Sequence, residues 1–191
     1  MMIISFTTST YVLLYMTTYA SQTLHMGPGA SFGATVANGV CGLVFTLLGG
    51  HLSDRLGRKP VMITARSLFL VATLPAFFLM NRHPTAVTVI AATAVMSALS
   101  STSVGAALVA LTESIRKENR SMAMAVLYAV AVTLFGGIAQ PGVSALVKAT
   151  GNPMAPAWYL MAAALMGVIA MILLPETRPV PDEVEAVVEL A

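Results

Sequence analysis

The stretch Gly50-His51-Leu52-Ser53-Asp54-Arg55-Leu56-Gly57-Arg58-Lys59-Pro60 separates two long apolar runs with a short charged turn. Its two glycines allow the backbone to turn sharply. The stretch places four charges within six positions, at Asp54, Arg55, Arg58 and Lys59. Charges flanked by apolar runs of this length are stable on the water side of a membrane boundary. This charged turn therefore predicts a loop between two membrane spans.

Composition supports an integral membrane protein. The chain is 57% hydrophobic and 9% charged, whereas a soluble globular domain has about 25% charged residues. The formal net charge of +2 is small and the basic residues lie in loops, so we expect no nucleic-acid partner. The single cysteine, Cys41, lies inside an apolar run, which rules out an intrachain disulfide and a cysteine metal cluster.

Runs without charged residues mark the spans, because a membrane helix needs about 20 mostly apolar residues. Four such runs are residues 3–23, 31–50, 84–112 and 122–147, the run 61–80 contains only Arg66 near its start, and a sixth run opens at Trp158 and Tyr159 and ends at Pro175-Glu176-Thr177. The sequence thus predicts an all-α integral membrane protein with six transmembrane helices over residues 1–177. A tail of residues 178–191, with four acidic residues and two prolines, is expected to be solvated.

Glycine and proline mark the breaks and bends. The stretch 25–29, His-Met-Gly-Pro-Gly, divides the first two spans, and the fourth span is long enough to be tilted or to protrude. The fifth span contains Gly136, Gly137 and Pro141, which weaken or kink a helix. A functional bend and close helix packing both explain them.

The basic residues predict the orientation. One face of the membrane receives eight and the other two, so the charged turn, the Glu113 loop and both termini are expected in the cytoplasm. The eight are Arg55, Arg58, Lys59, Arg66, Arg116, Lys117, Arg120 and Arg178, and the two are Arg82 and Lys148. We expect Lys59 to set orientation only, Arg66 to extend to the interface, and Tyr19 to anchor at an interface.

The first span has a polar stripe on one helical face. Its members recur at spacings of three and four residues, and they are Thr8, Tyr11, Tyr15, Thr18 and Gln22. Hydrogen-bonding groups in a membrane must face away from lipid. The stripe therefore lines a water-filled solute pathway or holds neighbouring helices together.

Other polar side chains give weaker indications. Asn38 in the second span and Gln140 in the fifth are candidates for solute contact. In the fourth span Ser97, Ser101 and Gly105 form a small face, which favours close helix packing over ligand binding.

The span centres contain no Asp, Glu, Lys, Arg or His. No proton carrier is therefore expected there, and Arg66 is the one cation that an anionic solute could reach. The sequence has no P-loop, no metal-binding cluster of His or Cys, and no nucleophile with a nearby base. We expect neither an enzyme nor a cofactor or metal.

The charged turn resembles the signature loop of the major facilitator superfamily, Gly-x-Leu-x-Asp-Arg-x-Gly-Arg-Arg/Lys, and matches it at every fixed position. Further segments look like the metabolite:proton symporter branch and occur in the same order. They are Ala110-Leu111-Thr112-Glu113, Leu134-Phe135-Gly136-Gly137 before Pro141, Ala149-Thr150-Gly151-Asn152 and Leu174-Pro175-Glu176-Thr177. The resemblance covers residues 3–177 and aligns with the second, carboxy-terminal half of that branch.

The resemblance implies secondary transport of a small organic acid or zwitterion with protons, by alternating access, across a bacterial inner membrane. It implies a missing six-span amino-terminal half and a conformational latch, a set of residues whose contacts set the balance between inward-open and outward-open states. The latch residues are Gly50, Asp54, Arg55, Gly57, Arg58, Lys59 and Glu113. By resemblance, Asp54 faces a helix amino terminus of the other half and Arg58 pairs with an acidic residue, for which Glu113 is nearest. The solute stays open.

An alternative interpretation is a six-span membrane protein without transport activity. Such an assembly subunit would pair with a second copy of itself or with a separate half. Co-purification with a separately encoded first half would favour transport.

Overall fold

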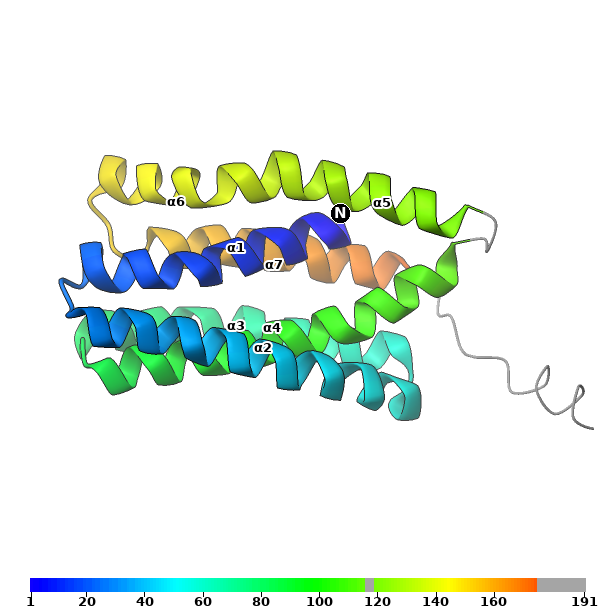
Figure 1. Ribbon diagram of the computed structural model, residues 1–191, viewed down its shortest axis with the longest axis horizontal. Helices are drawn as coiled ribbons and strands as arrows, with labels where there is room; N and C mark the ends of the chain where they lie inside the picture. The colour runs from blue at the N-terminus through cyan, green and yellow to red at the C-terminus, as the bar shows by residue number, and fades with distance from the viewer. Residues whose placement is uncertain (116–118, 175–191) are drawn as a thin grey trace, which may run out of the picture.

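The computed structural model describes residues 1–115 and 119–174, and within them every regular element is helical. These described residues form six continuous helical segments, which Figure 1 shows. These are α1 (Met2–Thr18) with the π-helical turn η1 (Tyr19–Thr23), α2 (Pro28–Leu56), α3 (Arg58–Arg82), α4 (Ala86–Ser114), α5 (Arg120–Val130) with η2 (Ala131–Gly136) and α6 (Gly137–Thr150), and α7 (Ala155–Leu173). Arg116, Lys117 and the predicted tail lie outside the described residues.

The segments lie side by side along one long axis (Figure 1). The line of α5, η2 and α6 forms one edge, α1 and α7 lie next to it, and α2, α3 and α4 lie on the other side. Packing is densest between α2 and α4, and α7 contacts both α1 and α3. The charged turn and the end of α4 lie at one end of the bundle, called the charged-turn end. The turns at η1 and Gly151 lie at the opposite end, called the far end.

Five helices are long and apolar enough to cross a membrane: α2, α3, α4, the continuous α5–α6 helix and α7. The first segment has 17 α-helical residues followed by five in π geometry, so its α-helical part alone is shorter than any of these five. An all-helical, multi-pass membrane protein is confirmed. The expected break between the first two segments is present, and Pro28 is the first residue of α2, where its missing N–H leaves no hydrogen bond unmade.

The charged turn is much tighter than the sequence predicts. The second span was expected to end at Gly50, but α2 continues to Leu56 and α3 begins at Arg58. The non-helical backbone is confined to Gly57, with φ of 97° and ψ of 151°, a conformation that strongly favours glycine. At about 1.5 Å per residue, the 29 residues of α2 exceed the ~30 Å hydrocarbon core. The charged last turns of α2 can therefore remain helical outside the membrane.

Close backbone approaches hold neighbouring helices together. A Cβ atom built on Gly105 would overlap the Thr46 carbonyl oxygen, and one built on Gly49 would overlap that of Thr102. Gly105 of the predicted small face therefore lies where α2 and α4 meet. On α5–α6, a Cβ on Gly136 would lie 2.7 Å from the Tyr11 ring. Gly136 thus allows close packing against α1, and residues 131–136 adopt π-helical geometry.

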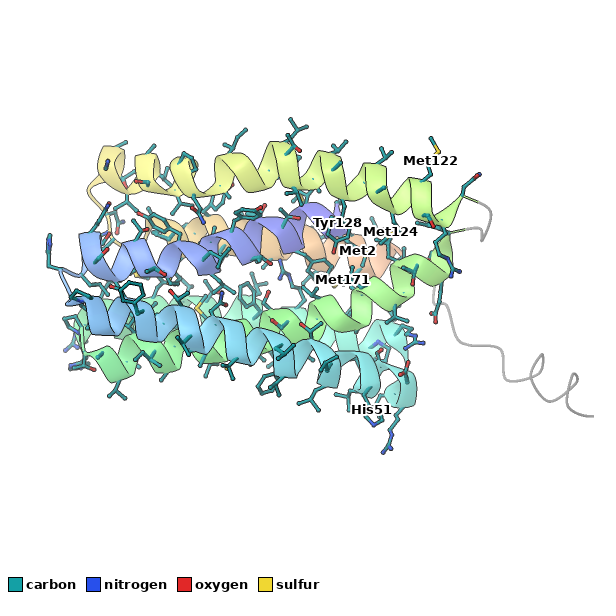
Figure 2. All side chains as sticks on the ribbon, viewed as in Figure 1. Met2, His51, Met122, Met124, Tyr128 and Met171 are labelled. Atoms are coloured by element: carbon teal, nitrogen blue, oxygen red, sulfur yellow. The ribbon has the colours of Figure 1, made fainter. Side chains whose placement is uncertain are left out.

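The apolar core lies between α1, α3, α4 and α7. One cluster, towards the far end, includes Phe69, Phe77 and Leu160. A second cluster lies near the charged-turn end and contains Met2 and Met171, which lie close together in Figure 2. The same figure shows Met122 pointing away from the bundle.

Candidate functional site

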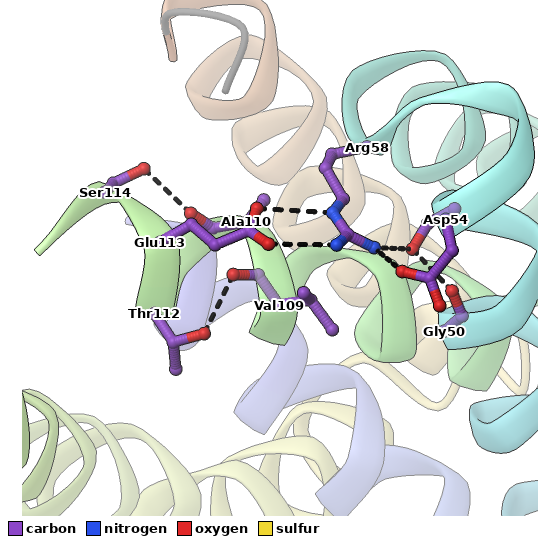
Figure 3. Close-up of polar contacts among 9 residues, drawn as sticks. Gly50, Asp54, Arg58, Val109, Ala110, Thr112, Glu113 and Ser114 are labelled. Atoms are coloured by element: carbon purple, nitrogen blue, oxygen red, sulfur yellow. Dashed lines mark hydrogen bonds and ion pairs between the residues drawn. The ribbon is translucent and has the colours of Figure 1, made fainter. Parts of the chain in front are cut away.

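Arg58, the first residue of α3, lies between two carboxylates (Figure 3). Its Nε and Nη2 atoms donate to the two carboxylate oxygens of Glu113 at 3.2 and 2.9 Å. Its Nη1 atom contacts the Asp54 carboxylate and donates to the Ser53 hydroxyl at 3.0 Å. The paired N–H groups match the geometry of a carboxylate. Arg58 therefore joins the end of α2 to the end of α4.

The two carboxylates differ in exposure. The side chain of Asp54 is 58% exposed and that of Glu113 is 32% exposed, whereas Arg58 is 7% exposed. Glu113 is thus the more enclosed partner of Arg58. Asp54 has an open side that a group from outside the bundle can approach.

The remaining residues of the charged turn serve different purposes. The backbone carbonyl of Gly50 accepts a hydrogen bond from Ser53 at 2.7 Å. Arg55 is exposed, and His51 points away from the bundle (Figure 2). Neither side chain is part of the Arg58 cluster.

Lys59 has a structural contact that the sequence analysis did not predict. Its Nζ atom donates to the carbonyl oxygens of Ile172 and Leu174, both at 2.9 Å. These carbonyl groups lie at the carboxy-terminal end of α7, where no further turn of helix supplies N–H donors for them. A cation is favourable at a helix carboxy terminus. The expectation that Lys59 only sets orientation is therefore wrong, because the residue also attaches α3 to the end of α7.

The polar stripe on α1 faces the α5–α6 edge. Thr8 and Tyr15 are buried, Tyr11 and Thr18 are half-buried, and Gln22 is exposed. The Tyr11 ring packs on Gly136 and its backbone carbonyl lies 3.4 Å from the side-chain nitrogen of Gln140.

Two members of the stripe line a cavity of about 430 Å³ at the far end, between α1 and α6. These are Tyr15 and Gln22, and Ser144 and Lys148 lie opposite them. The stripe thus combines a helix contact at Tyr11 with a cavity lining at Tyr15 and Gln22.

Asn38 lies apart from this cavity, contrary to the expectation that it is near the stripe. It lines a second cavity, of about 200 Å³, whose walls come from α1, α2 and α4. The lining of this α1–α2–α4 cleft combines the apolar residues Leu13 and Val104, and Gly42, with six polar residues: Thr10, Asn38, Thr46, Ser97, Ser100 and Ser101. Thr10 follows Ser9 and precedes Tyr11, and one residue turns a helix face by about 100°. The second span therefore meets a different face of α1 from the one that holds the stripe.

Comparison with known proteins agrees with this geometry. The sequence profile of the Major Facilitator Superfamily matches residues 1–189. The chain belongs to the major facilitator superfamily. A citrate-proton symporter of Salmonella typhi is 30% identical over 175 residues, which is 91% of this chain and 40% of the relative. A proline/betaine transporter of Escherichia coli K12 is 28% identical over 172 residues, 90% of this chain and 34% of the relative.

A citrate-proton symporter of Klebsiella pneumoniae is 28% identical over 172 residues, 89% of this chain and 39% of the relative. These names agree with the metabolite:proton symporter branch of the superfamily. The chain spans about 40% of the length of the symporters that it matches.

Within this superfamily member, Arg66 is placed differently from the prediction. The side chain was expected to extend to the interface, but it is 0% exposed. Its Nη2 atom donates to the Ser5 carbonyl at 2.8 Å, to the Ser5 hydroxyl at 2.5 Å and to the Ser9 hydroxyl at 2.7 Å, and Nη1 lies 3.5 Å from the Ser100 hydroxyl. Polar groups on α1 and α4 can hold the guanidinium inside the bundle, so the prediction is wrong.

Aromatic rings complete the environment of Arg66. The guanidinium carbon lies 5.1 Å from the ring centre of Phe6 and 5.0 Å from that of Phe69, distances at which a cation is attracted to a ring face. Among the described residues, no carboxylate forms an ion pair with Arg66. The Nε atom has no hydrogen-bond partner there.

Tyr19 is also buried, although an interfacial position was expected. It is 0% exposed, and its hydroxyl donates to the Pro153 carbonyl at 2.8 Å and accepts from the side-chain nitrogen of Asn81 at 2.9 Å. The residue therefore joins η1, the end of α3 and the α6–α7 turn. Its hydrogen bonds come from distant parts of the chain, which the local sequence does not indicate.

Metal binding has no site among the described residues: no group of three or more His, Cys, Asp or Glu side chains is close enough together to hold an ion. The residues that sequence analysis missed are hydroxyl-bearing side chains. Ser5 and Ser9 are four residues apart on α1 and face Arg66, and Thr10 and Thr17 face α2. Their spacing was a usable signal.

Proposed function

We propose that this chain works as the carboxy-terminal, six-span half of a secondary transporter that moves a small organic acid or zwitterion with protons by alternating access. The main support is the Arg58 cluster, which lies at the charged turn in a member of a superfamily whose named relatives include citrate-proton symporters and proline/betaine transporters. The names of those relatives also support a function other than catalysis.

The distribution of buried surface agrees with a half transporter. In the most apolar stretch of each helix, the share of residues that are buried is 11% for α2 and 17% for α5–α6. The corresponding shares are 39% for α3, 44% for α4 and 39% for α7. Two helices on opposite edges thus leave most of their surface for lipid or for another bundle. The length of the chain relative to its relatives supports the same proposal.

The orientation that fits this function places the charged-turn end in the cytoplasm of a bacterial inner membrane, with both termini there. It rests on the eight-to-two distribution of basic residues. Arg82 and Lys148, which end α3 and lie in the last turn of α6, would then be on the opposite side.

The Arg58 cluster is proposed to be the conformational latch. Glu113 holds Arg58 within the bundle, and the exposed carboxylate of Asp54 is free to approach a helix amino terminus of the other half, where an anion is favoured. Tyr11, Tyr15, Thr18 and Gln22, with Gln140, are proposed to line the solute pathway on one side of α1, and Asn38 lines it on the other.

Proteoliposomes test the half-transporter proposal. The purified 191-residue chain should show no saturable uptake of citrate or proline under an imposed proton gradient, because alternating access needs a second half to move against. Uptake that a protonophore abolishes would contradict the half-transporter proposal and favour a dimer of six-span units. The alternative function, an assembly subunit without transport, would be supported if the chain co-purified with a partner and the complex also showed no uptake.

A further inference from the structure

The charge of Arg66 is unbalanced inside the bundle. The groups that accept its hydrogen bonds are hydroxyls and a backbone carbonyl, which are neutral. An ionisable side chain in a membrane span normally pairs with an opposite charge or faces a polar cavity. Since the described residues supply no anionic partner, we looked for a cavity that the guanidinium reaches.

The α1–α2–α4 cleft is that cavity. Ser100 lines the cleft, and its hydroxyl lies 3.5 Å from Nη1 of Arg66. The guanidinium thus lies directly behind one wall of the cleft. The opposite wall, on α2, contains Asn38 and Thr46, so neutral hydrogen-bonding groups lie on two sides of a space that has a cation behind it.

We propose that this cleft binds the carboxylate group of an anionic or zwitterionic ligand, and that Arg66 stabilises the bound carboxylate electrostatically, from behind Ser100, without contacting it. The Ser97 hydroxyl already donates to the Asn38 backbone carbonyl at 2.9 Å, but the hydroxyls of the other lining serines and threonines can donate hydrogen bonds to carboxylate oxygens. A charge interaction is stronger here than in water, because the surrounding protein and lipid have a low dielectric constant. The inference rests on the proposed function only for the type of ligand.

The size of the cleft limits what it holds. At about 200 Å³, it is smaller than the ~300–1,000 Å³ pockets that enclose whole drug-sized ligands. At about 30 Å³ per water molecule, its volume equals that of about six waters, which is enough for a carboxylate group and a few more heavy atoms. The same cleft can therefore serve ligands that differ beyond the carboxylate, whether dicarboxylates or zwitterions.

A thiol at position 42 can report the electrostatic potential in the cleft. A Cβ built on Gly42 would lie 3.8 Å from the Ser101 hydroxyl and 4.0 Å from that of Ser97, so a cysteine fits there and faces the cleft. The reporter chain is Gly42→Cys with Cys41→Ser, in lipid nanodiscs. The measurement is the ratio of its reaction rates with an anionic and a cationic methanethiosulfonate reagent, together with protection by succinate.

With Arg66 present, the ratio of the rate with the anionic reagent to the rate with the cationic reagent should be about tenfold higher than for a free thiol in the same buffer. This is the order of effect expected from one positive charge that acts through protein of low dielectric constant. Arg66→Met should remove most of this excess. Lys148→Met, which removes a cation beside the other cavity, is the matched control and should leave the ratio unchanged. Succinate at millimolar concentration should slow modification with Arg66 and not with Arg66→Met.

A purely structural Arg66 would give a different result. Arg66→Met would then lower thermal stability while the rate ratio stayed the same, and that outcome overturns the proposal. If Arg66→Met does not fold, a reporter chain with Arg66 whose ratio equals that of the free thiol overturns it equally. If succinate does not slow the modification, the proposal that the cleft binds a carboxylate is refuted. None of these measurements requires transport, so failure of the half-transporter proposal would be seen separately.

Discussion

Replacing Glu113 with glutamine is expected to lower the free energy of unfolding by about 2 kcal/mol. Arg58 is 7% exposed, and Glu113, 32% exposed, accepts two hydrogen bonds from it at 3.2 and 2.9 Å. Glutamine keeps one acceptor oxygen but removes the charge and the second acceptor. Removing one partner of a fully buried ion pair costs about 3–5 kcal/mol. The partial exposure of Glu113, and the second carboxylate at Asp54, reduce that cost.

The measurement is denaturant unfolding of the chain in mixed micelles. Asp54→Asn is the matched control, because it removes a carboxylate from the same guanidinium at a position that is 58% exposed, and it should cost less than about 1 kcal/mol. A double-mutant cycle of Glu113→Gln with Arg58→Met isolates the interaction and should give a coupling energy of about 1.5–2 kcal/mol. A coupling below about 0.5 kcal/mol, or equal costs for the two carboxylates, would refute the reasoning.

Three further predictions concern the two ends of the bundle and the stripe. Lys59→Ala should lower the free energy of unfolding by about 1–1.5 kcal/mol, because two carbonyls at the end of α7 lose their donor. The control is Arg55→Ala, which changes an exposed neighbour, and equal losses of stability in the two variants would contradict the assignment. An Asn119→Cys variant should resist an impermeant thiol reagent added to intact cells, since the charged-turn end is expected in the cytoplasm, and labelling from outside would reverse the topology. Tyr15→Phe and Gln22→Ala should each weaken solute binding by about 1 kcal/mol with little change in thermal stability, whereas a stripe that only joins helices would give the opposite pattern.

The positions of the helices could be predicted from the sequence because charged residues are costly in a membrane centre. Their ends were harder to predict, as α2 illustrates. A charged residue does not end a helix that has left the membrane, so Asp54 and Arg55 remain helical. What ends α2 is the positive φ at Gly57. The two glycines of the charged turn look alike in the sequence, but only Gly57 adopts this backbone conformation.

The environment of a side chain depends on helices that are distant in sequence, and here prediction was least successful. Arg66 near a helix end suggested extension to the interface, but α1 and α4 surround it with hydroxyls. The sequence places Asn38 in the second span, but it does not show which face of α1 that span packs against. The stripe and Thr10 lie on different faces of one helix, and packing decides which face meets α2: Tyr11 lies against Gly136 of η2, whereas Thr10 lines the cleft with α2 and α4.

The hydrogen bonds at both ends indicate where movement in a transporter would occur. At the charged-turn end, Arg58 joins α3 to α4 and Lys59 joins α3 to α7. At the far end, Tyr19 joins η1 to α3 and to the α6–α7 turn. A change of shape within the bundle would have to break these contacts at both ends, each at a cost of about 1 kcal/mol or more. Movement of the whole bundle against a partner breaks none of these contacts. Within the Arg58 cluster, such a movement would affect mainly the exposed carboxylate of Asp54. We therefore expect the proposed alternating access to proceed by rigid-body rotation.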